Sequence, residues 1–244
     1  MCWSATASVA MVGLGAAATV ITVARGRPWA IPTALGYFTV MEALQAAGYL
    51  VIDECGSPVN QSLTLLSYLH IAFQPFIINA FALELVPAGV KRRVAPWVYG
   101  CCALSAIVML MQLYPFDWVG SCRSGASLCG PELCLTSGTW HIAWDIPYNG
   151  MLIPLEEWFG IDASFPTYAL TAFIIPFAYG AWRFVLFHLL AGPVLADLLT
   201  SNPNETPAVW CLFSVGIILI GLSPALADRF STRGWGLWPD RWRG

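Results

Sequence analysis

The chain has 244 residues, of which 58% are hydrophobic and only 10% are charged, and its net charge is −3. Soluble domains carry about 25% charged residues, so this composition excludes an ordinary soluble protein and indicates one that is embedded in a membrane. There is no basic stretch suited to nucleic acid, so we expect no nucleic-acid partner. No positive charge precedes the first apolar run, so we expect that run to remain as a transmembrane helix and not to be cleaved as a signal peptide.

Apolar runs of the length that a membrane span requires recur along the chain. They predict spans at about 5–24, 28–52, 61–85, 94–114, 139–157, 165–190 and 207–227. The fifth run is short, and we expect Glu156 and Glu157 to mark its cytoplasmic end. The sixth run stays apolar to about 199, which is too long for one straight span at about 1.5 Å per residue. Pro176 or the Gly192-Pro193 pair can break it, so one helix and two helices both remain open.

Basic residues predict the orientation of these spans. Two lie between the first and second spans, three between the third and fourth, and four in the tail, which together make nine of the 11 Lys and Arg residues. The positive-inside rule makes this side cytoplasmic, so we expect the amino terminus outside and the carboxyl terminus in the cytoplasm. The two exceptions are Arg123, in an outer loop, and Arg183, within an apolar run.

The sequence therefore predicts an all-α fold, a single transmembrane domain of about seven helices over residues 1–244. It carries an extracytoplasmic, cysteine-bearing loop at 115–138 and a short cytoplasmic tail at 229–244. An alternative with the same orientation has a re-entrant segment at 141–155, followed by separate helices on either side of Arg183. We expect the protein to be integral to a membrane, and we place it in the bacterial inner (cytoplasmic) membrane.

Cysteines gather in the segments that we place on the outer face. The candidates for structural disulfides, which persist outside the reducing cytosol, are Cys55, Cys122, Cys129 and Cys134. Cys2 is a fifth cysteine on that face, so one of the five would stay free or serve another role. The pairing does not follow from the sequence.

Ionisable side chains within apolar runs are costly and are candidates for function. The chain has only three histidines, all in or against predicted spans and all placed on the outer side: His70, His141 and His188. Glu42 and Asp145 lie at similar depth, on predicted helix faces whose polar residues are spaced three or four apart. We expect Arg183 to pair with Asp145 or Glu42, because an unpaired cation there is costly.

Three histidines and a carboxylate form a ligand set for zinc or another divalent transition metal, with one position open for water. A metal-bound water hydrolyses amides and esters. The first hypothesis is therefore a metal-dependent membrane enzyme that acts on a lipid or isoprenoid, with Glu42 or Asp145 as acid or base. The second is a non-enzymatic membrane subunit of a larger complex, whose histidines pack against neighbouring helices or hold a pigment or haem. The sequence leaves open whether the protein is an enzyme.

Four short segments resemble an uncharacterised family of multi-span membrane proteins of bacteria and large DNA viruses. They are Met-Cys-Trp-Ser at 1–4, Met-Glu-Ala-Leu-Gln at 41–45, Tyr-Leu-His-Ile-Ala-Phe-Gln-Pro at 68–75 and Asn-Pro-Asn-Glu at 202–205. The resemblance covers nearly the whole chain, and it implies no established activity.

Two further resemblances are local. The segment Pro-Leu-Glu-Glu at 154–157 is similar to the Pro-x-Glu-Glu motif of the membrane lycopene cyclases, whose carboxylates act as acids on a carotenoid end group. A seven-span bundle with Ser67 and the histidines and aspartate named above is similar to the membrane zinc hydrolases of the ceramidase and adiponectin-receptor type. Those enzymes carry a paired HxxxH motif in the last span, whereas the span at 207–227 has no histidine here.

Overall fold

Helices dominate the fold in a computed structural model of the chain, which describes residues 5–159 and 165–238. The α-helices are α1 (Ala5–Ala24), α2 (Ala30–Gly48), α3 (Pro58–Ala82), α4 (Ala88–Gln112), α5 (Ile153–Phe159), α6 (Pro166–Ala169), α7 (Ile175–Ala178), α8 (Trp182–Leu189), α9 (Leu195–Leu199), α10 (Thr206–Trp210), α11 (Leu212–Leu222) and α12 (Pro224–Phe230). Two π-helical segments, Leu170–Ile174 and Leu190–Val194, join α6 to α7 and α8 to α9. Cys2, Arg241, Arg243 and the rest of the tail from 239 lie outside the described residues.

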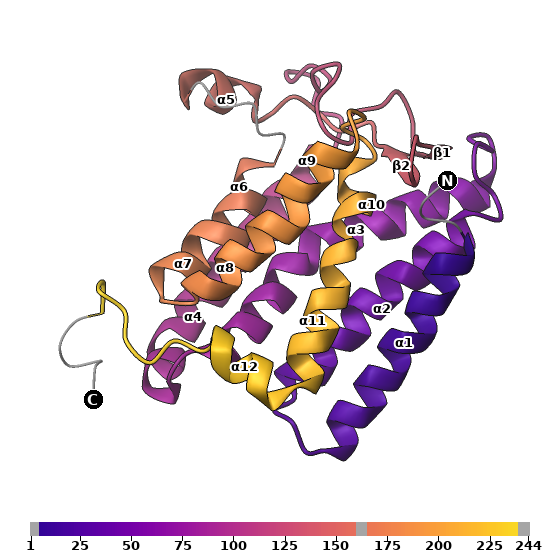
Figure 1. Ribbon diagram of the computed structural model, residues 1–244. Helices are drawn as coiled ribbons and strands as arrows, with labels where there is room; N and C mark the ends of the chain where they lie inside the picture. Colours follow the sequence, from indigo (N-terminus) through magenta and orange to yellow (C-terminus); the bar gives the residue numbers. More distant parts are fainter. Residues whose placement is uncertain (1–4, 160–164, 239–244) are drawn as a thin grey trace.

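The long helices pack beside one another and alternate in direction (Figure 1). Helix α5, two short strands and the connections that follow α2, α4 and α9 lie at one end of the bundle, which we call the cap end. Helix α12 and the connections that follow α1, α3 and α7 lie at the other end, which we call the α12 end. Helices α1 and α2 approach closely at Gly15, where a Cβ atom would come within 2.1 Å of Thr39 Oγ1. Small residues at such crossings are typical of packed membrane helices.

Several of these helices have the length and composition of membrane spans. Four described helices qualify individually: Ala5–Ala24, Pro58–Leu85, Ala88–Gln112 and Trp182–Leu199. The pair Thr206–Leu222 and Pro224–Phe230, bent by 109°, gives a fifth if it is taken as one span, and 166–178 is a shorter apolar helix. Large apolar side chains on these helices point outward, among them Leu14, Val20 and Leu104. A lipid environment would cover them, so the fold is compatible with a membrane protein.

The helix predicted at 139–157 is wrong. This segment and the one before it form an antiparallel pair of strands, β1 (Cys134–Ser137) and β2 (Ile142–Asp145), in which Leu135 faces Trp144. Both of these side chains are buried, so the hairpin has the hydropathy of a short span although it is extended. Pro147 then interrupts regular backbone hydrogen bonding, because proline has no backbone N–H.

Helix α5 follows the hairpin and lies at the cap end (Figure 1). Its Glu157 forms an ion pair with Arg123 of the cysteine-bearing loop, at 3.2 Å. The expectation that Glu156 and Glu157 mark the opposite, cytoplasmic end of a span is therefore wrong, because the segment does not cross the bundle.

The apolar run at 165–199 forms two antiparallel helical rods, α6–α7 and α8–α9 (Figure 1). The chain reverses at Gly180, whose φ of +103° is a conformation that side-chain-bearing residues rarely adopt. A Cβ atom there would also lie 2.7 Å from the Trp238 ring. The run thus forms two helical rods and not one, which is the alternative that the sequence left open. The break lies just before Arg183.

Arg183 consequently lies at the α12 end and not inside the bundle. Its Nη1 donates to the carbonyl oxygens of Arg229 (2.9 Å) and Ser231 (3.1 Å). The expected pairing of Arg183 with Asp145 or Glu42 is wrong, because those carboxylates lie nearer the cap end.

Candidate functional site

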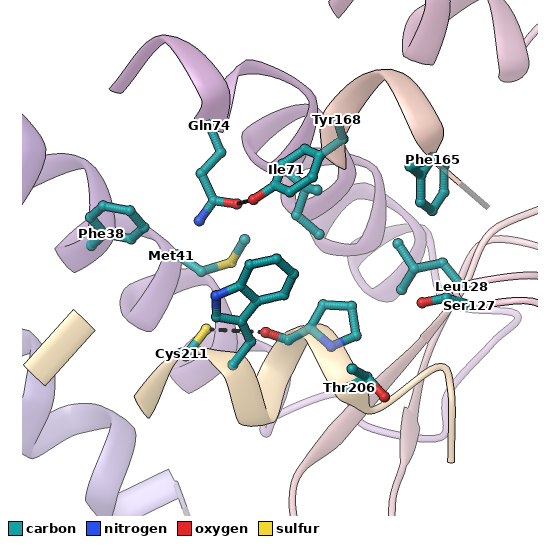
Figure 2. Close-up of a pocket in the computed structure, with 12 residues that line it drawn as sticks. Phe38, Met41, Ile71, Gln74, Ser127, Leu128, Phe165, Tyr168, Thr206 and Cys211 are labelled. Atoms are coloured by element: carbon teal, nitrogen blue, oxygen red, sulfur yellow. Dashed lines mark hydrogen bonds between the residues drawn. The ribbon is translucent and has the colours of Figure 1, made fainter. Parts of the chain in front are cut away.

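A cavity of about 100 Å³ lies between the bundle and the cap end, and we call it the central cavity (Figure 2). Helices α2, α3, α6 and α10 and two cap-end segments line it, through Phe38, Met41, Ile71, Gln74, Ser127, Leu128, Phe165, Tyr168, Thr206, Pro207, Trp210 and Cys211. Most of this lining is apolar or aromatic. Tyr168 and Gln74 form a polar pair in it, in which the Tyr168 hydroxyl donates to Gln74 Oε1 at 2.6 Å. An apolar pocket with a few placed polar groups is the usual form of a small-molecule site.

Trp210 forms one wall of the central cavity and is held by other aromatic rings. Its ring stacks on Phe173 with centroids 5.7 Å apart and meets the edge of Tyr168 at 5.9 Å. Gly192 leaves room for the Trp210 ring, because a Cβ atom at Gly192 would lie 2.2 Å from Trp210 Nε1. The kinked π-helical segment around Gly192 thus fixes the shape of the cavity.

Glu42 lies close to the central cavity on α2 and is almost fully buried, with 2% of its surface exposed. Among the described residues, no group hydrogen-bonds either of its carboxylate oxygens. One turn further along the same face, Gln45 Nε2 donates to Cys211 Sγ at 2.9 Å, and Cys211 lines the cavity. A buried carboxyl group without a hydrogen-bond partner is unfavourable, and the role of acid or base that the sequence suggested for Glu42 stays a prediction.

His70 does not meet Glu42 in the bundle. Its imidazole stacks on the ring of Tyr37, with centroids 3.7 Å apart, and the Tyr37 hydroxyl donates to the His70 carbonyl oxygen. Tyr37 precedes Glu42 by five residues on α2, which corresponds to roughly 7 Å along the helix. His70 therefore packs against a helix at a level nearer the α12 end than the carboxylate.

His188 and His141 lie at two other levels. His188 follows the start of α8 at the α12 end by six residues, or about 9 Å, and packs against Phe173 and Trp210. It therefore lies nearer the α12 end than the cap end, whereas the sequence placed it at the same end of the bundle as His141. His141 lies in the cap-end hairpin, where its Nδ1 is 2.8 Å from the Tyr49 hydroxyl. Burial lowers the pKa of His141 from 6.5 to about 4.

The described residues contain no group of three or more His, Cys, Asp or Glu side chains that could hold a metal ion. The donor set proposed for zinc or another divalent metal, namely His70, His141 and His188 with a carboxylate, is thus not brought together. The described residues therefore do not fit a metal centre.

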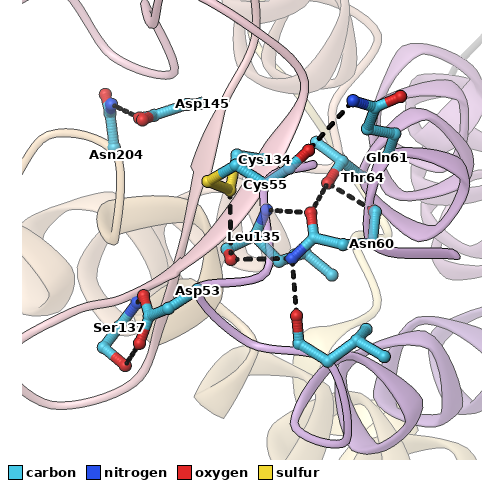
Figure 3. The surroundings of a disulfide bond; sticks show 11 residues. Asp53, Cys55, Asn60, Gln61, Thr64, Cys134, Leu135, Ser137, Asp145 and Asn204 are labelled. Carbon is cyan, nitrogen blue, oxygen red and sulfur yellow. Dashed lines mark hydrogen bonds between the residues drawn. A yellow bond between two sulfur atoms is a disulfide. The ribbon is translucent and has the colours of Figure 1, made fainter. Parts of the chain in front are cut away.

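Disulfides and side-chain hydrogen bonds hold the cap end together (Figure 3). The four cysteines expected in disulfides form two pairs, Cys55–Cys134 and Cys122–Cys129. Beside the first pair, Asn60 Nδ2 donates to the Val51 and Leu135 carbonyl oxygens, and Asn60 Oδ1 accepts from Leu135 N. The start of α3 is thereby attached to β1 by one covalent link and two hydrogen bonds, and a third hydrogen bond ties it to the turn after α2.

Glu205 is the most highly coordinated carboxylate that the structure describes. It accepts hydrogen bonds from the backbone N–H groups of Thr139, Trp140 and His141 and from the Thr200 hydroxyl. The carboxylate is fully buried, and these donors replace the water that it loses. It fixes the turn between β1 and β2 against the loop before α10.

Asp145, the second acid or base that the sequence suggested, has structural contacts. Its Oδ1 accepts from Asn204 Nδ2 at 2.7 Å, and the same amide group donates to the Cys129 carbonyl oxygen at 3.2 Å. Gly130 packs closely against Asp145, since a Cβ atom added at Gly130 would lie 2.3 Å from the Asp145 Cβ. These contacts support a role in holding the hairpin, and Asp145 is not among the residues that line the central cavity.

The sequence signalled some of these residues and missed others. Gln74 was placed on the face of His70, and Asn-Pro-Asn-Glu at 202–205 was recognised only as part of a family-like segment. Tyr168, Trp210 and Glu205 were not singled out, because their partners lie on helices or loops far away in the chain. The sequence signal for Glu205 was a glutamate within the polar Asn-Pro-Asn-Glu loop, between two apolar runs.

Residues 6–231 match the model of a protein family described as a family of unknown function (DUF5765). The chain matches no curated protein and no solved structure. The match agrees with the resemblance to an uncharacterised family, whereas the resemblances to the lycopene cyclases and to the membrane zinc hydrolases remain predictions.

Proposed function

The chain belongs to this family of unknown function, and we propose from its own geometry that it is an integral membrane protein that binds a lipid or isoprenoid ligand in the central cavity. The observation that carries the proposal is a mostly apolar cavity with an internal polar pair, next to a buried carboxyl group without a described partner. Intramembrane ionisable groups in such positions are candidates for function by default.

In the membrane, we propose seven crossings with the cap end outside. The crossings are α1, α2, α3, α4, α6–α7, α8–α9 and α10–α11. Alternating direction supports this arrangement (Figure 1), as do the basic residues at the α12 end and the disulfides at the cap end. The rod at 166–178 is short for a span, at roughly 20 Å, and the connections around it would have to complete its crossing.

The size of the central cavity limits what it can hold. An engineered apolar cavity of about 150 Å³ accommodates benzene, so a cavity of about 100 Å³ admits one end of a ligand and not a whole lipid. Phe38, Phe165 and Trp210 present aromatic surface to that end, which suits a branched or unsaturated hydrocarbon such as an isoprene unit. The Tyr168–Gln74 pair provides a hydroxyl and an amide for a polar group on it.

Binding is favoured over metal-dependent hydrolysis because the described residues offer no set of three metal donors. We propose that Glu42 is the ionisable group that senses the bound ligand, through Gln45 on its own helix face and through Cys211, which accepts from Gln45 and lines the cavity. We therefore propose a non-enzymatic binding protein. This agrees with the hypothesis of a membrane subunit that belongs to a larger complex.

The test is to extract the detergent-purified protein with organic solvent and identify the released molecules by mass spectrometry. Ile71→Trp would fill the cavity from α3, and Leu66→Trp is the matched control because Leu66 is 48% exposed on the same helix. We expect a lipid or isoprenoid that co-purifies with the wild type and Leu66→Trp and is lost from Ile71→Trp. Equal amounts in all three proteins would refute the proposal, provided that both variants elute as monodisperse species.

A further inference from the structure

A second hollow lies on the outside of the bundle near the α12 end, and we call it the α4–α7 groove. It has a volume of about 520 Å³ and runs between the first half of α4 and α7, with Leu237 of the chain after α12 at its edge. It shares no lining residue with the central cavity. Its floor includes the buried side chains of Val98 and Tyr179.

The groove changes from charged to apolar along its length. Arg93, Trp97 and Cys101 line it from α4 at intervals of four residues, so they form one stripe on that helix. Arg93 is exposed near the start of α4 at the α12 end, Trp97 is 80% exposed one turn further on, and Cys101 is an exposed free thiol after another turn. Tryptophan is typical of the level where headgroups meet hydrocarbon.

The described lining of the groove is positively charged, because it includes Arg93 and none of its described residues is acidic. Arg93 follows Lys91 and Arg92 in the first turns of α4. The groove thus has a guanidinium group at its polar end and an apolar channel beyond it. These are the two parts that a phospholipid with an anionic headgroup would contact.

We propose that the α4–α7 groove binds one anionic phospholipid, with its phosphate on Arg93 and an acyl chain between Trp97 and Ile175. The inference rests on the proposed insertion of the bundle in a membrane, and it assigns the lipid to the leaflet at the α12 end. It adds a site to the one proposed above, for a different ligand class. Basic pockets between transmembrane helices on the cytoplasmic side bind anionic headgroups by the same means.

The test is native mass spectrometry of the full-length protein released from nanodiscs that contain phosphatidylglycerol and phosphatidylcholine in equal amounts. We expect the wild type to retain one phosphatidylglycerol preferentially and Arg93→Gln to retain it about fivefold less, as expected for the loss of one arginine contact. Arg233→Gln is the matched control, because Arg233 lies at the same end, pairs with Asp228 and does not line the groove. Its retention of phosphatidylglycerol should equal that of the wild type.

A second variant separates the groove from general electrostatic attraction. Ala178→Trp would fill the groove without changing any charge, since Ala178 lines it and is exposed, and it should also lose the lipid. Equal retention by Arg93→Gln and Arg233→Gln, or equal retention of phosphatidylcholine and phosphatidylglycerol by the wild type, would overturn the proposal. Nanodiscs carry both lipids in both leaflets, so the lipid retained by the groove does not depend on which end of the bundle is cytoplasmic. The ligand of the central cavity is identified by its own solvent extraction, so failure of one proposal is distinguishable from failure of the other.

Discussion

Two buried glutamates of this protein have opposite surroundings, which leads to opposite expectations for their replacement. Glu205 accepts from three backbone N–H groups and the Thr200 hydroxyl. Hydrogen bonds to a charged group contribute about 1.5–3 kcal/mol each, and Glu205→Gln would place an NH₂ group against these donors. We expect a loss of roughly 3 kcal/mol and a clearly lower midpoint of thermal unfolding in detergent. Glu132→Gln, at an exposed cap-end position, should unfold like the wild type.

Glu42 should behave in the opposite way. Its carboxylate oxygens have no hydrogen-bond partner among the described residues, and burial of an unsatisfied polar group costs about 1–3 kcal/mol. Glu42→Leu removes that group, so we expect a higher thermal midpoint together with weaker retention of the ligand of the central cavity. Such a trade between stability and function is typical of a functional site. A lower midpoint with unchanged ligand retention would assign Glu42 to structure.

His141 gives the cap end a dependence on pH. Burial holds its pKa near 4 in the folded protein, compared with 6.5 for an ordinary histidine, so between these values the unfolded chain binds a proton that the folded protein does not. The free energy of unfolding therefore decreases as pH falls from about 6.5 to about 4, by roughly 3 kcal/mol in total. Thermal midpoints of the wild type and His141→Gln across this range should converge at low pH. Parallel profiles would contradict the assignment.

At the scale of elements, the two disulfides should differ in strength. Cys55–Cys134 closes a segment of 79 residues and links the start of α3 to β1, whereas Cys122–Cys129 spans seven residues. Cross-links that close longer loops stabilise more in the chain-entropy view, and native disulfides contribute about 2–5 kcal/mol. We expect the double alanine variant of Cys55 and Cys134 to lower the thermal midpoint more than that of Cys122 and Cys129. The reverse order would show that the hairpin is held mainly by Asn60 and Glu205.

The helices that could be predicted from the sequence are those whose apolar character and length agree. Hydropathy located α1, α2 and α3 to within a few residues and found α4, although that helix begins six residues earlier than expected. It failed at 139–157, because a buried hairpin and a short span share the same composition, and only tertiary contacts such as Trp144 N to the Asn204 carbonyl oxygen distinguish them. The sequence named Pro176 and Gly192-Pro193 as breaks and did not locate the reversal at Gly180 for a related reason, since that turn is defined by a positive φ and by contact with Trp238.

The candidate site was less predictable than the fold. Residue type pointed to Glu42 and the histidines, but depth along each predicted helix did not decide which of them meet. His188 was misplaced because its helix starts at the opposite end of the bundle from the one assumed. The backbone donors to Glu205 and the aromatic rings around Trp210 lie on segments far earlier in the chain. Local periodicity carries no information on such pairs.

For the whole molecule, the distribution of charge decides the proposed orientation. Eight of the nine described Lys and Arg residues lie at the α12 end, and the exception is Arg123 of the cap end. Arg183, an anomaly in the sequence, joins the majority once its helix pair is formed. In the orientation that we propose, the α12 end faces the cytoplasm, as the positive-inside rule predicts, and the disulfide-linked cap end faces an oxidising compartment.

Labelling by a membrane-impermeant maleimide tests this orientation directly. We would place single cysteines at two exposed positions, Asp117→Cys at the cap end and Arg92→Cys at the α12 end, in a background in which Cys2 and Cys101 are serine. In intact cells, Asp117→Cys should react, and Arg92→Cys should react only after lysis. The two positions lie at opposite ends of α4, which is one proposed crossing of the membrane. The opposite pattern would invert the protein and move the lipid of the α4–α7 groove to the outer leaflet. Reaction of both positions in intact cells would contradict the membrane-spanning arrangement itself.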